Sequence, residues 1–366
     1  MFNISKEREN ILHLSNEEYE KLNFEYIKDS FFYHYANCKS YRLYCDSLNF
    51  TPNNLKTIED LTKIPLVTTD VFKYMSVYTG ESNEQMMKCV SSGTQGGRST
   101  IFRDKETIEN MLFSVSLIKE VIYGNRKIER KPRLFVISPT GDDNKELWIA
   151  NVLKLVENVY TTGYYVKDKN VLEEKLYADI CNMNCENEFP VIVTPPILLL
   201  HFIDYLKSNH IELDFGKMGG VIITAGGWKK ANNQNVHKEE FKNRIITEFH
   251  INEPENVRDA FNMVELNTIL IDCEEGNYHL PPWIKMYTVN PKDMRAQTNN
   301  EEGVLCFCDA SSLSYPAFVI TDDFGRVSEM EDCKCGCKAP YFSYSRRITK
   351  AEGRGCARKI DLSIEK

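Results

Sequence analysis

The chain has 366 residues, 42% of them hydrophobic, which is enough for one large domain or two domains of ordinary size. Its 45 lysines and arginines are outnumbered by 53 aspartates and glutamates, and the formal net charge is -8. Because no long basic run interrupts this balance, the composition argues against nucleic acid as the main partner.

From the sequence pattern we expect neither a signal peptide nor a membrane-spanning segment. Residues 1–10 carry charges where a signal peptide needs an apolar stretch. The most apolar run, residues 191–206, is interrupted by Pro195, Pro196 and His201, so we expect no membrane span. We therefore expect a cytoplasmic protein. Twelve cysteines are too sparse for a disulfide scaffold, so most should be reduced thiols.

The N-terminal part of the chain is expected to be helical. Between Asn16 and Leu48, apolar and aromatic residues recur at helical spacing, and Asn16 precedes two glutamates as a helix cap does. Two β-prone runs follow, at residues 86–90 and 100–103, and they predict a hairpin.

The tip of this predicted hairpin combines hydroxyls with glycines. Glycines let backbone N–H groups approach a ligand closely, and Ser, Thr and Arg side chains add further donors. The pattern predicts a phosphate-binding loop, although neither a Walker A motif nor Gly-x-Gly-x-x-Gly is present and an ordinary surface loop stays an alternative. The candidate phosphate contacts are Ser91, Ser92, Gly93, Thr94, Gly96 and Arg98.

Helices and strands alternate through the middle of the chain. A helix at residues 105–123 precedes a strand at 133–138, and the alternation then continues. The expected strands are 159–162, 191–194 and 221–224, and the expected helices are 145–155, 171–183, 197–207 and 238–249. This order predicts an α/β sheet with crossover helices. From Asn256 the pattern becomes strand-rich, with turns expected at 275–277, 302–303 and 324–325, and it predicts a smaller β-rich subdomain.

Two segments beyond the loop carry residues suited to a nucleotide base and its metal ion. The strand at 221–224 leads into Gly226 and Gly227, and glycines at a strand's carboxyl end let a flat ring approach the backbone. Phe261 is a candidate to stack on adenine, and Glu265, four residues later, is a candidate Mg²⁺ ligand.

Two later segments suit a ribose and a phosphate. Asp323 follows an apolar run and can accept hydrogen bonds from ribose hydroxyls. Arg346, about twenty residues further on, is a candidate contact for the ribose or a phosphate. Each of these segments also has an ordinary structural interpretation, such as a turn-capping Asp or a solvated basic pair.

In this order the segments resemble the adenylate-forming superfamily, from about residue 86 to the C-terminus. The resemblance implies the N-terminal-type domain of that superfamily, with layered α/β sheets and a smaller β-rich C-terminal subdomain. Because the chain stops twenty residues after Arg346, we expect most of the superfamily's mobile C-terminal domain to be missing. Two departures stand out: Gly97-Arg98-Ser99 replaces the usual lysine and proline after the loop, and Asp322 replaces the usual glycine before Asp323.

Four segments give a closer match, namely residues 225–229, 279–283, 333–336 and 351–357. Together they look like the acyl-protein synthetase (LuxE-like) branch. That resemblance implies an ATP-dependent ligase that activates a fatty carboxylate as acyl-AMP. It also implies transfer of the acyl group to a cysteine thiol and then to a partner, an acyl-CoA-reductase-type protein (LuxC-like) of a fatty acid reductase complex.

Cys356 is the candidate thiol. It lies between small neighbours and near three cations, which favour the nucleophilic thiolate, and it matches the family's near-terminal acyl-carrying cysteine. His279 and Trp283, beside Pro281 and Pro282, are candidates to line the acyl site. An inert tail cysteine and a turn with a packed tryptophan are the alternatives.

A zinc site is a further hypothesis, because thiolates are the structural ligands that zinc prefers. Its candidate ligands are Cys306, Cys333, Cys335 and Cys337, with unmetallated thiols as the alternative. Isolated cysteines such as Cys273 are interpreted as small core residues.

The expected organisation is an N-terminal helical region at 1–85, an α/β adenylation core at 86–255, a β-rich subdomain at 256–344 and a short tail at 345–366. Two rival functions stay open. An acyl- or aryl-CoA ligase would share the adenylation motifs without needing Cys356, and a zinc-binding interaction protein would need neither ATP nor the loop.

Overall fold

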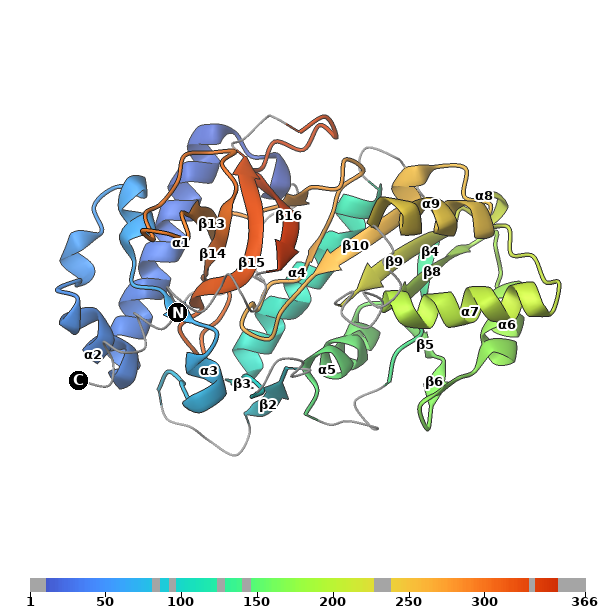
Figure 1. The fold of residues 1–366 in the computed structure, drawn as a ribbon, viewed down its shortest axis with the longest axis horizontal. Helices are drawn as coiled ribbons and strands as arrows, with labels where there is room; N and C mark the ends of the chain where they lie inside the picture. Colours follow the sequence, from blue (N-terminus) through green and yellow to red (C-terminus); the bar gives the residue numbers. More distant parts are fainter. Residues whose placement is uncertain are drawn as a thin grey trace. The chain divides into compact units, whose positions relative to one another are not determined.

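A computed structural model of the chain describes residues 11–80, 86–91, 97–123, 129–139, 146–226, 238–328 and 333–347. The chain forms two compact units (Figure 1). Unit 1 consists of Met1–Ser114, Met263–Thr268 and Asn277–Lys366, and unit 2 of Val115–Asn262 and Ile269–Gly276, as far as these residues are described.

Unit 1 begins with the expected helical region. Helix α1 (Asn16–Asn37) is capped by Ser15, one residue before the expected cap. The Ser15 hydroxyl accepts from the Glu18 N–H at 3.3 Å, and the Glu18 carboxylate accepts from the Ser15 N–H. Helix α2 (Lys39–Ser47) follows directly. The remaining elements of this part are α3 (Val71–Tyr74), β1 (Val67–Thr68) and short 3₁₀ helices at Ile11–His13, Pro52–Asn54 and Ile58–Lys63.

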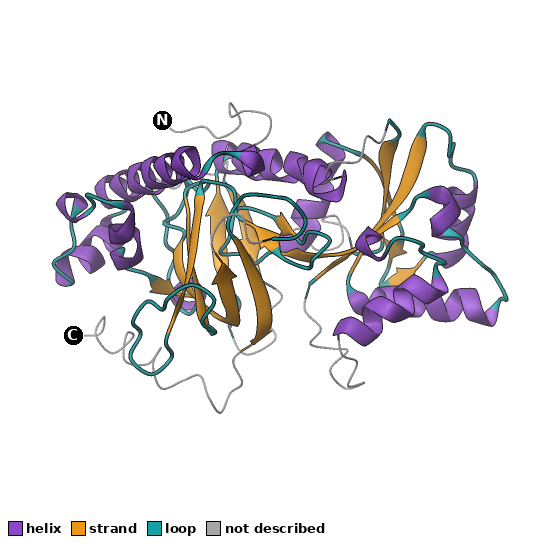
Figure 2. Ribbon diagram, turned by 90° about the horizontal axis from the view of Figure 1, so that it is seen from above, coloured by secondary structure: helices purple, strands orange, loops and turns teal. Residues whose placement is uncertain are grey.

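The main sheet of unit 1 is built by the C-terminal part of the chain, as the strand-rich pattern predicted. Its strands are β12 (Tyr278–His279), β13 (Ile284–Val289), β14 (Gly303–Asp309), β15 (Phe318–Ser328) and β16 (Tyr341–Arg347). They are antiparallel in the order β12-β16-β15-β14-β13, and β1 joins β15 in parallel. Helix α1 packs on this sheet, since Asn23 donates to the carbonyls of Pro282 and Ile284 (Figure 2).

The turn expected at Phe324 and Gly325 is absent, because β15 runs through both residues. The register with β16 shifts between them, which marks a β-bulge. A Cβ atom on Gly325 would lie 2.3 Å from the Ser343 carbonyl oxygen. The glycine therefore permits a close approach of two strands instead of a change in chain direction.

The expected hairpin is confirmed. Strands β2 (Met87–Val90) and β3 (Thr100–Arg103) pair antiparallel, and α4 (Lys105–Tyr123) begins two residues later. This order places the hydroxyl- and glycine-rich segment between the two strands of the hairpin, and strand β3 leads on into a long helix.

Unit 2 has the expected α/β organisation. Its sheet has the order β11-β10-β9-β8-β4-β5, and all neighbours are parallel except β10 and β11. Parallel neighbours need crossover connections, which helices supply here. The strands are β4 (Lys131–Val136), β5 (Thr161–Tyr164), β8 (Glu188–Thr194), β9 (Val221–Ala225), β10 (Val257–Phe261) and β11 (Leu270–Ile271), with a small hairpin of β6 (Val166–Lys167) and β7 (Asn170–Val171).

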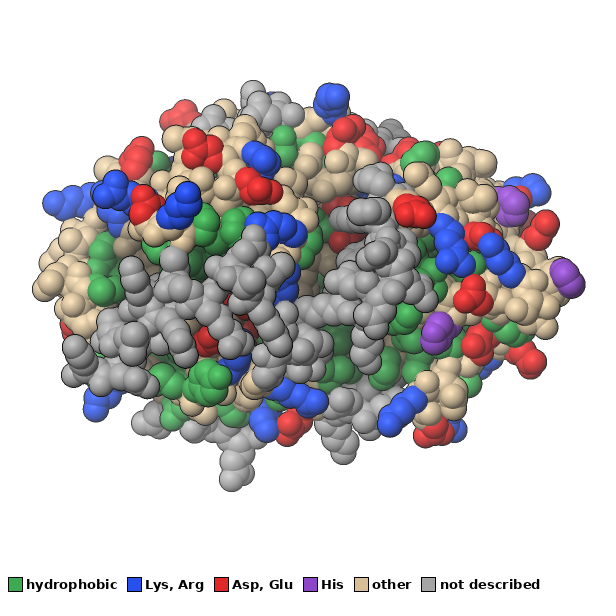
Figure 3. Space-filling model, viewed as in Figure 1, with side chains coloured by type: hydrophobic (Ala, Val, Ile, Leu, Met, Phe, Trp, Pro, Cys, Tyr) green, Lys and Arg blue, Asp and Glu red, His purple; other side chains and the backbone are tan. Residues whose placement is uncertain are grey.

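The helices of unit 2 are α5 (Trp148–Leu155), α6 (Glu173–Cys181), α7 (Pro196–Ser208), α8 (Phe215–Met218) and α9 (Lys238–Glu248), with 3₁₀ helices at Val156–Asn158 and Pro254–Asn256. Its core joins strand residues such as Phe135 and Ile222 with Phe202 of α7 and Phe241 of α9. None of the described helices is long and apolar enough to cross a membrane. Acidic and basic side chains are interspersed on the face shown in Figure 3, as the charge balance implies.

Candidate active site

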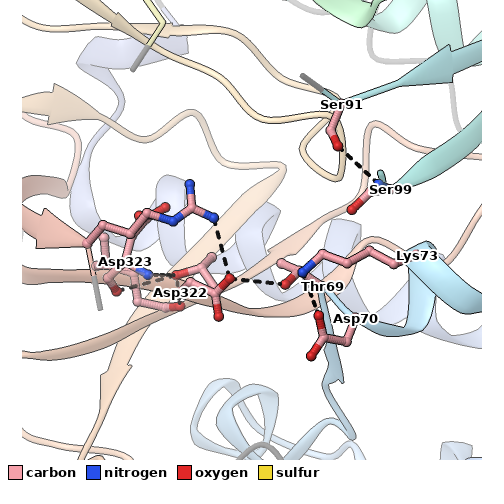
Figure 4. Close-up of polar contacts among 10 residues, drawn as sticks. Thr69, Asp70, Lys73, Ser91, Ser99, Asp322 and Asp323 are labelled. Atoms are coloured by element: carbon pink, nitrogen blue, oxygen red, sulfur yellow. Dashed lines mark hydrogen bonds and ion pairs between the residues drawn. The ribbon is translucent and has the colours of Figure 1, made fainter. Parts of the chain in front are cut away.

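The two ends of the predicted phosphate loop are joined at the hairpin tip. The Ser91 N–H donates to the Ser99 carbonyl oxygen at 3.0 Å, and the Ser99 N–H donates to the Ser91 hydroxyl at 3.0 Å (Figure 4). These two bonds fix where the loop begins and ends. Arg98 is exposed at the end of the loop. The predicted contacts Ser92, Gly93, Thr94 and Gly96 lie outside the described residues.

A lysine from another element lies beside this loop. A Cβ atom on Gly97 would be 3.5 Å from the Cβ of Lys73, in α3, and the Lys73 Nζ pairs with Asp70 at 2.5 Å. The sequence reasoning did not single out Lys73. The structure therefore places a lysine next to the position where Gly97-Arg98-Ser99 replaces the lysine and proline expected from the resemblance.

Glu265 is a buried acid within unit 1, with 4% of its surface exposed. Burial raises the pKa of its carboxyl, while a hydrogen bond with Ser99 and the positive charges of Lys73 and Arg347 act in the opposite direction. The carboxyl group thus lies at the base of the loop, next to a hydroxyl and within the field of two cations.

The backbone around Glu265 is held by buried polar groups. Arg103 donates to the Val264 carbonyl at 2.6 Å and to the Asn267 side chain at 2.9 Å, and the Tyr315 hydroxyl donates to the Glu265 carbonyl at 3.2 Å. The Asp309 carboxylate accepts the N–H of Asn267 at 2.9 Å. Arg103 and Asp309 carry no sequence signal for this role, because their partners lie between 42 and 164 residues away. Together they position Glu265.

Two aspartates and an arginine lie on neighbouring strands. Asp323 is paired across β15 and β16 with Arg347, whose Nη2 is 3.4 Å from the Asp322 carboxylate and whose Nε is 4.0 Å from that of Asp323 (Figure 4). The Asp323 N–H donates to the Thr321 hydroxyl at 3.0 Å, and the Thr69 hydroxyl lies 3.5 Å from the Asp322 carboxylate.

Arg346 has a different environment from Arg347. Its guanidinium stacks over the Phe324 ring, 4.3 Å from the ring centre. Consecutive strand residues point to opposite faces of a sheet, and Arg347 is the arginine that lies opposite Asp323 in the register of β15 and β16. Arg347 makes the contacts with Asp322 and Asp323. The assignment of Arg346 to the ribose or a phosphate stays a prediction.

The predicted adenine residues belong to unit 2. Strands β9 and β10 are parallel neighbours with Ala225 opposite Ala260, so Gly226 and Phe261 lie at the same carboxyl edge of the sheet. Gly226 has φ +94°, and no atom of the described residues lies within 4 Å of a Cβ added to it. This edge is where open α/β sheets bind ligands. Gly227 lies outside the described residues.

The candidate acyl-site residues are buried inside unit 1. Trp283 is fully buried and its indole N–H donates to the Thr268 hydroxyl at 3.0 Å. The His279 Nε2 lies 3.1 Å from the Cys335 sulfur. Their assignment to an acyl site stays a prediction, as does that of Cys356, which lies outside the described residues.

The candidate zinc ligands separate into two kinds. Cys333 and Cys335 are grouped with His279 and Cys273. Cys306 is fully buried in β14 between Tyr287 and Ile320, and the Cys337 thiol donates to the Leu12 carbonyl at 3.3 Å. Neither Cys306 nor Cys337 is part of that group.

Comparison with solved structures supports the α/β fold. A crystal structure of 2-hydroxyisobutyryl-CoA ligase, in complex with 2-HIB-AMP and CoA in an open conformation, superposes with a TM-score of 0.70. The sequences are 13% identical, and the match covers 92% of this chain and 72% of the ligase. A structure of the same ligase in its thioesterification state matches with a TM-score of 0.69. The expected fold of an adenylate-forming enzyme is therefore confirmed.

Comparison of sequences identifies the family. A long-chain-fatty-acid–luciferin-component ligase of Aliivibrio fischeri is 31% identical over 356 residues, which is 96% of this chain and 91% of the relative. The protein of the same name from Vibrio harveyi is 29% identical over 343 residues, covering 94% and 88% of the two chains. The family model described as acyl-protein synthetase, LuxE, matches residues 8–364. The chain therefore belongs to the acyl-protein synthetase (LuxE) family, as the order of its motifs indicated.

Proposed function

We propose that this protein uses ATP to activate a long-chain fatty acid as an acyl adenylate and then takes the acyl group onto a cysteine of its own. One observation carries the proposal: the buried Glu265 carboxyl lies at the base of a hydroxyl- and glycine-rich loop, within the field of Lys73 and Arg347. The acid is inferred from the relatives, whose names describe long-chain-fatty-acid ligases.

The first step needs no general base, because a carboxylate is already ionised at neutral pH. A carboxylate oxygen attacks the α-phosphorus of ATP. The bond from that phosphorus to the oxygen bridging to the β-phosphate breaks, and pyrophosphate leaves with the electron pair. Such a step depends on positioning and on neutralising charge. In this proposal the loop between Ser91 and Ser99 holds the phosphates, and Arg98 and Lys73 supply positive charge.

The residues around Glu265 suit Mg²⁺, which prefers oxygen ligands. Glu265 offers a carboxylate, and Ser99, to which it is hydrogen-bonded, offers a hydroxyl. A bound Mg²⁺ would neutralise charge on the polyphosphate and favour the ionised form of the buried carboxyl. Glu265 is therefore the residue that we assign to the ion.

The remaining assignments follow the sequence motifs. We assign the ribose hydroxyls to Asp323, with Arg347 beside it, since the two are cross-strand partners. We assign the adenine to the sheet edge at Gly226 and Phe261, at the carboxyl ends of β9 and β10. In both places the contacts with ATP are part of the proposal.

The second step is assigned to Cys356. Its thiolate would attack the acyl carbonyl of the mixed anhydride, the bond to AMP would break, and a thioester would form. The acyl group would then pass to a thiol of an acyl-CoA-reductase-type partner (LuxC-like). Coenzyme A as the acceptor is the rival that the experiment separates.

The test measures pyrophosphate release from ATP in the presence of acids of increasing chain length, from acetate to palmitate. We expect release to depend on the acid and to be greatest for the longer chains. The same protein, incubated with an alkyne-tagged fatty acid, should carry a label that hydroxylamine removes, as a thioester requires.

Cys356→Ser should release pyrophosphate but lose the covalent label, whereas Cys185→Ser, which alters an exposed cysteine, should keep both. If no acid supports pyrophosphate release, the enzymatic proposal is wrong. If Cys356→Ser keeps its label, or if coenzyme A accepts the acyl group in preference to the protein, the assignment of the thiol is wrong.

A further inference from the structure

We propose that Cys273, His279, Cys333 and Cys335 bind one structural Zn²⁺ ion. Ligand atoms from these four residues all lie within 4.8 Å of one another. Around a tetrahedral zinc with Zn–S distances of about 2.3 Å and Zn–N distances of about 2.0 Å, neighbouring ligand atoms are about 3.5 to 3.8 Å apart. The group therefore has nearly the dimensions of a zinc site.

His279 is oriented as a zinc ligand. Its Nδ1 lies 3.0 Å from the Ala339 carbonyl oxygen, and a carbonyl only accepts hydrogen bonds, so Nδ1 must carry the proton. The lone pair of Nε2 then points to the Cys335 sulfur, 3.1 Å away. A histidine that donates one ring N–H to a carbonyl and directs the other nitrogen at a metal is the usual arrangement in zinc sites.

Two of the sulfur atoms accept hydrogen bonds from N–H groups. The Cys337 backbone N–H lies 3.4 Å from the Cys335 sulfur, and the Asn277 side-chain amide lies 3.4 Å from the Cys333 sulfur. Hydrogen bonds of this kind to ligand atoms are the outer contacts that orient the ligands of a metal site.

The backbone around the two thiols supports the same conclusion. It forms a turn that closes just after Cys335, where Gly336 has φ +81° and donates its N–H to the Cys333 carbonyl at 3.2 Å. This turn allows Cys333 and Cys335 to converge, which an extended Cys-x-Cys segment such as that of Cys306 and Cys308 in β14 does not do.

The ligand set favours zinc over other ions and a structural role over a catalytic one. Three thiolates and one imidazole are a soft set that suits zinc and excludes Mg²⁺, which prefers oxygen. Four protein ligands complete the tetrahedral shell and leave no position for a substrate. Cys273, Cys333 and Cys335 are thiols and form no disulfide.

The ion would brace the strands that carry the candidate active site. His279 is in β12, and Cys333 and Cys335 precede β16, its antiparallel partner. Cys273 lies six residues before His279 along the chain. Strand β16 ends at Arg347, which contacts Asp322 and Asp323. The site does not depend on the proposed function, because a bracing ion would be present whichever acid or acceptor is used.

The test is the zinc content of the full chain after removal of any polyhistidine tag. Elemental analysis should give about one zinc per chain for the wild type, and X-ray absorption should show three sulfur ligands at about 2.3 Å and one nitrogen ligand. Cys335→Ser should lose most of the zinc. Cys337→Ser, which removes a neighbouring thiol outside the group, and Cys181→Ser, which removes an exposed one, should keep it.

A second measurement guards against variants that do not fold. Removing zinc from the wild type with a thiol-specific reagent and a chelator should lower the melting temperature, and adding Zn²⁺ under reducing conditions should restore it. The inference is overturned if folded wild-type protein from zinc-supplemented cells contains no zinc. It is also overturned if Cys337→Ser loses as much zinc as Cys335→Ser, because the ligands would then be a different set.

Discussion

Substituting Glu265 by Gln should separate catalysis from stability. The amide has nearly the same shape as the carboxylate and keeps an oxygen that can accept from the Ser99 hydroxyl, but it carries no charge. Glu265 is only 4% exposed, so water screens its charge little. Removing one such preorganised electrostatic group costs about 10²-fold to 10³-fold in kcat, or roughly 3 to 4 kcal/mol. We expect this loss in acid-dependent pyrophosphate release, with a higher requirement for Mg²⁺.

The stability of the Glu265→Gln variant should not fall together with its activity. Burial raises the pKa of Glu265, so its contribution to folding is fully present below its ordinary pKa of 4.5 and is lost as the pH rises through the folded-state pKa. The glutamine amide of the variant does not ionise. At neutral pH the variant Glu265→Gln should therefore be at least as stable as the wild type, and its relative advantage should disappear in acid. Urea unfolding at both pH values measures this difference.

The matched control is Glu302→Gln, which neutralises an exposed acid of unit 1 and should leave pyrophosphate release unchanged. Two results would refute the reasoning about Glu265. One is a kcat within about threefold of the wild type, since the missing charge would then have no role in the transition state. The other is a variant whose activity falls only because the folded fraction falls, which urea unfolding on the same samples would reveal.

Three further predictions concern unit 1. Lys73→Met should slow pyrophosphate release by about 10-fold to 100-fold, which is less than the change at Glu265 because Lys73 is partly exposed. Lys73→Arg should recover most of the lost rate. Equal rates for the Met and Arg variants would contradict a charge role. Asp323→Asn should raise the KM for ATP by about tenfold or more with a smaller change in kcat, since hydrogen bonds to a charged group contribute about 1.5 to 3 kcal/mol. An unchanged KM would show that Asp323 does not bind the ribose. Burial lowers the pKa of His34 from 6.5 to about 4. The neutral imidazole therefore contributes about 3 kcal/mol to the free energy of unfolding above pH 6.5, and this contribution is lost as the pH falls toward 4. Urea unfolding of the wild type and His34→Gln should show a stability difference that shrinks in acid, and a difference independent of pH would show that His34 does not titrate as its burial requires.

Local patterns were sufficient for much of the fold and for the family. The hairpin and its loop were predictable because both strands and the turn residues lie within twenty positions of the sequence. The alternation of helices and strands in unit 2 followed from hydrophobic periodicity, and the order of the motifs was enough to indicate the acyl-protein synthetase family. The turn expected at Gly325 failed, because a glycine that ends a strand and one that permits close strand packing look alike in sequence.

Residue types and their order were enough to show which kinds of group this protein has available: a phosphate loop, an acid four residues after an aromatic ring, an aspartate, two arginines and a set of thiols. Which of these groups meet depends on the folded chain. Lys73 lies beside Gly97, Arg347 pairs with Asp323 while Arg346 stacks on Phe324, and His279 joins Cys333 and Cys335. Each of these contacts depends on strand register or on packing between distant segments, and a shift of one residue reverses the face to which a strand side chain points.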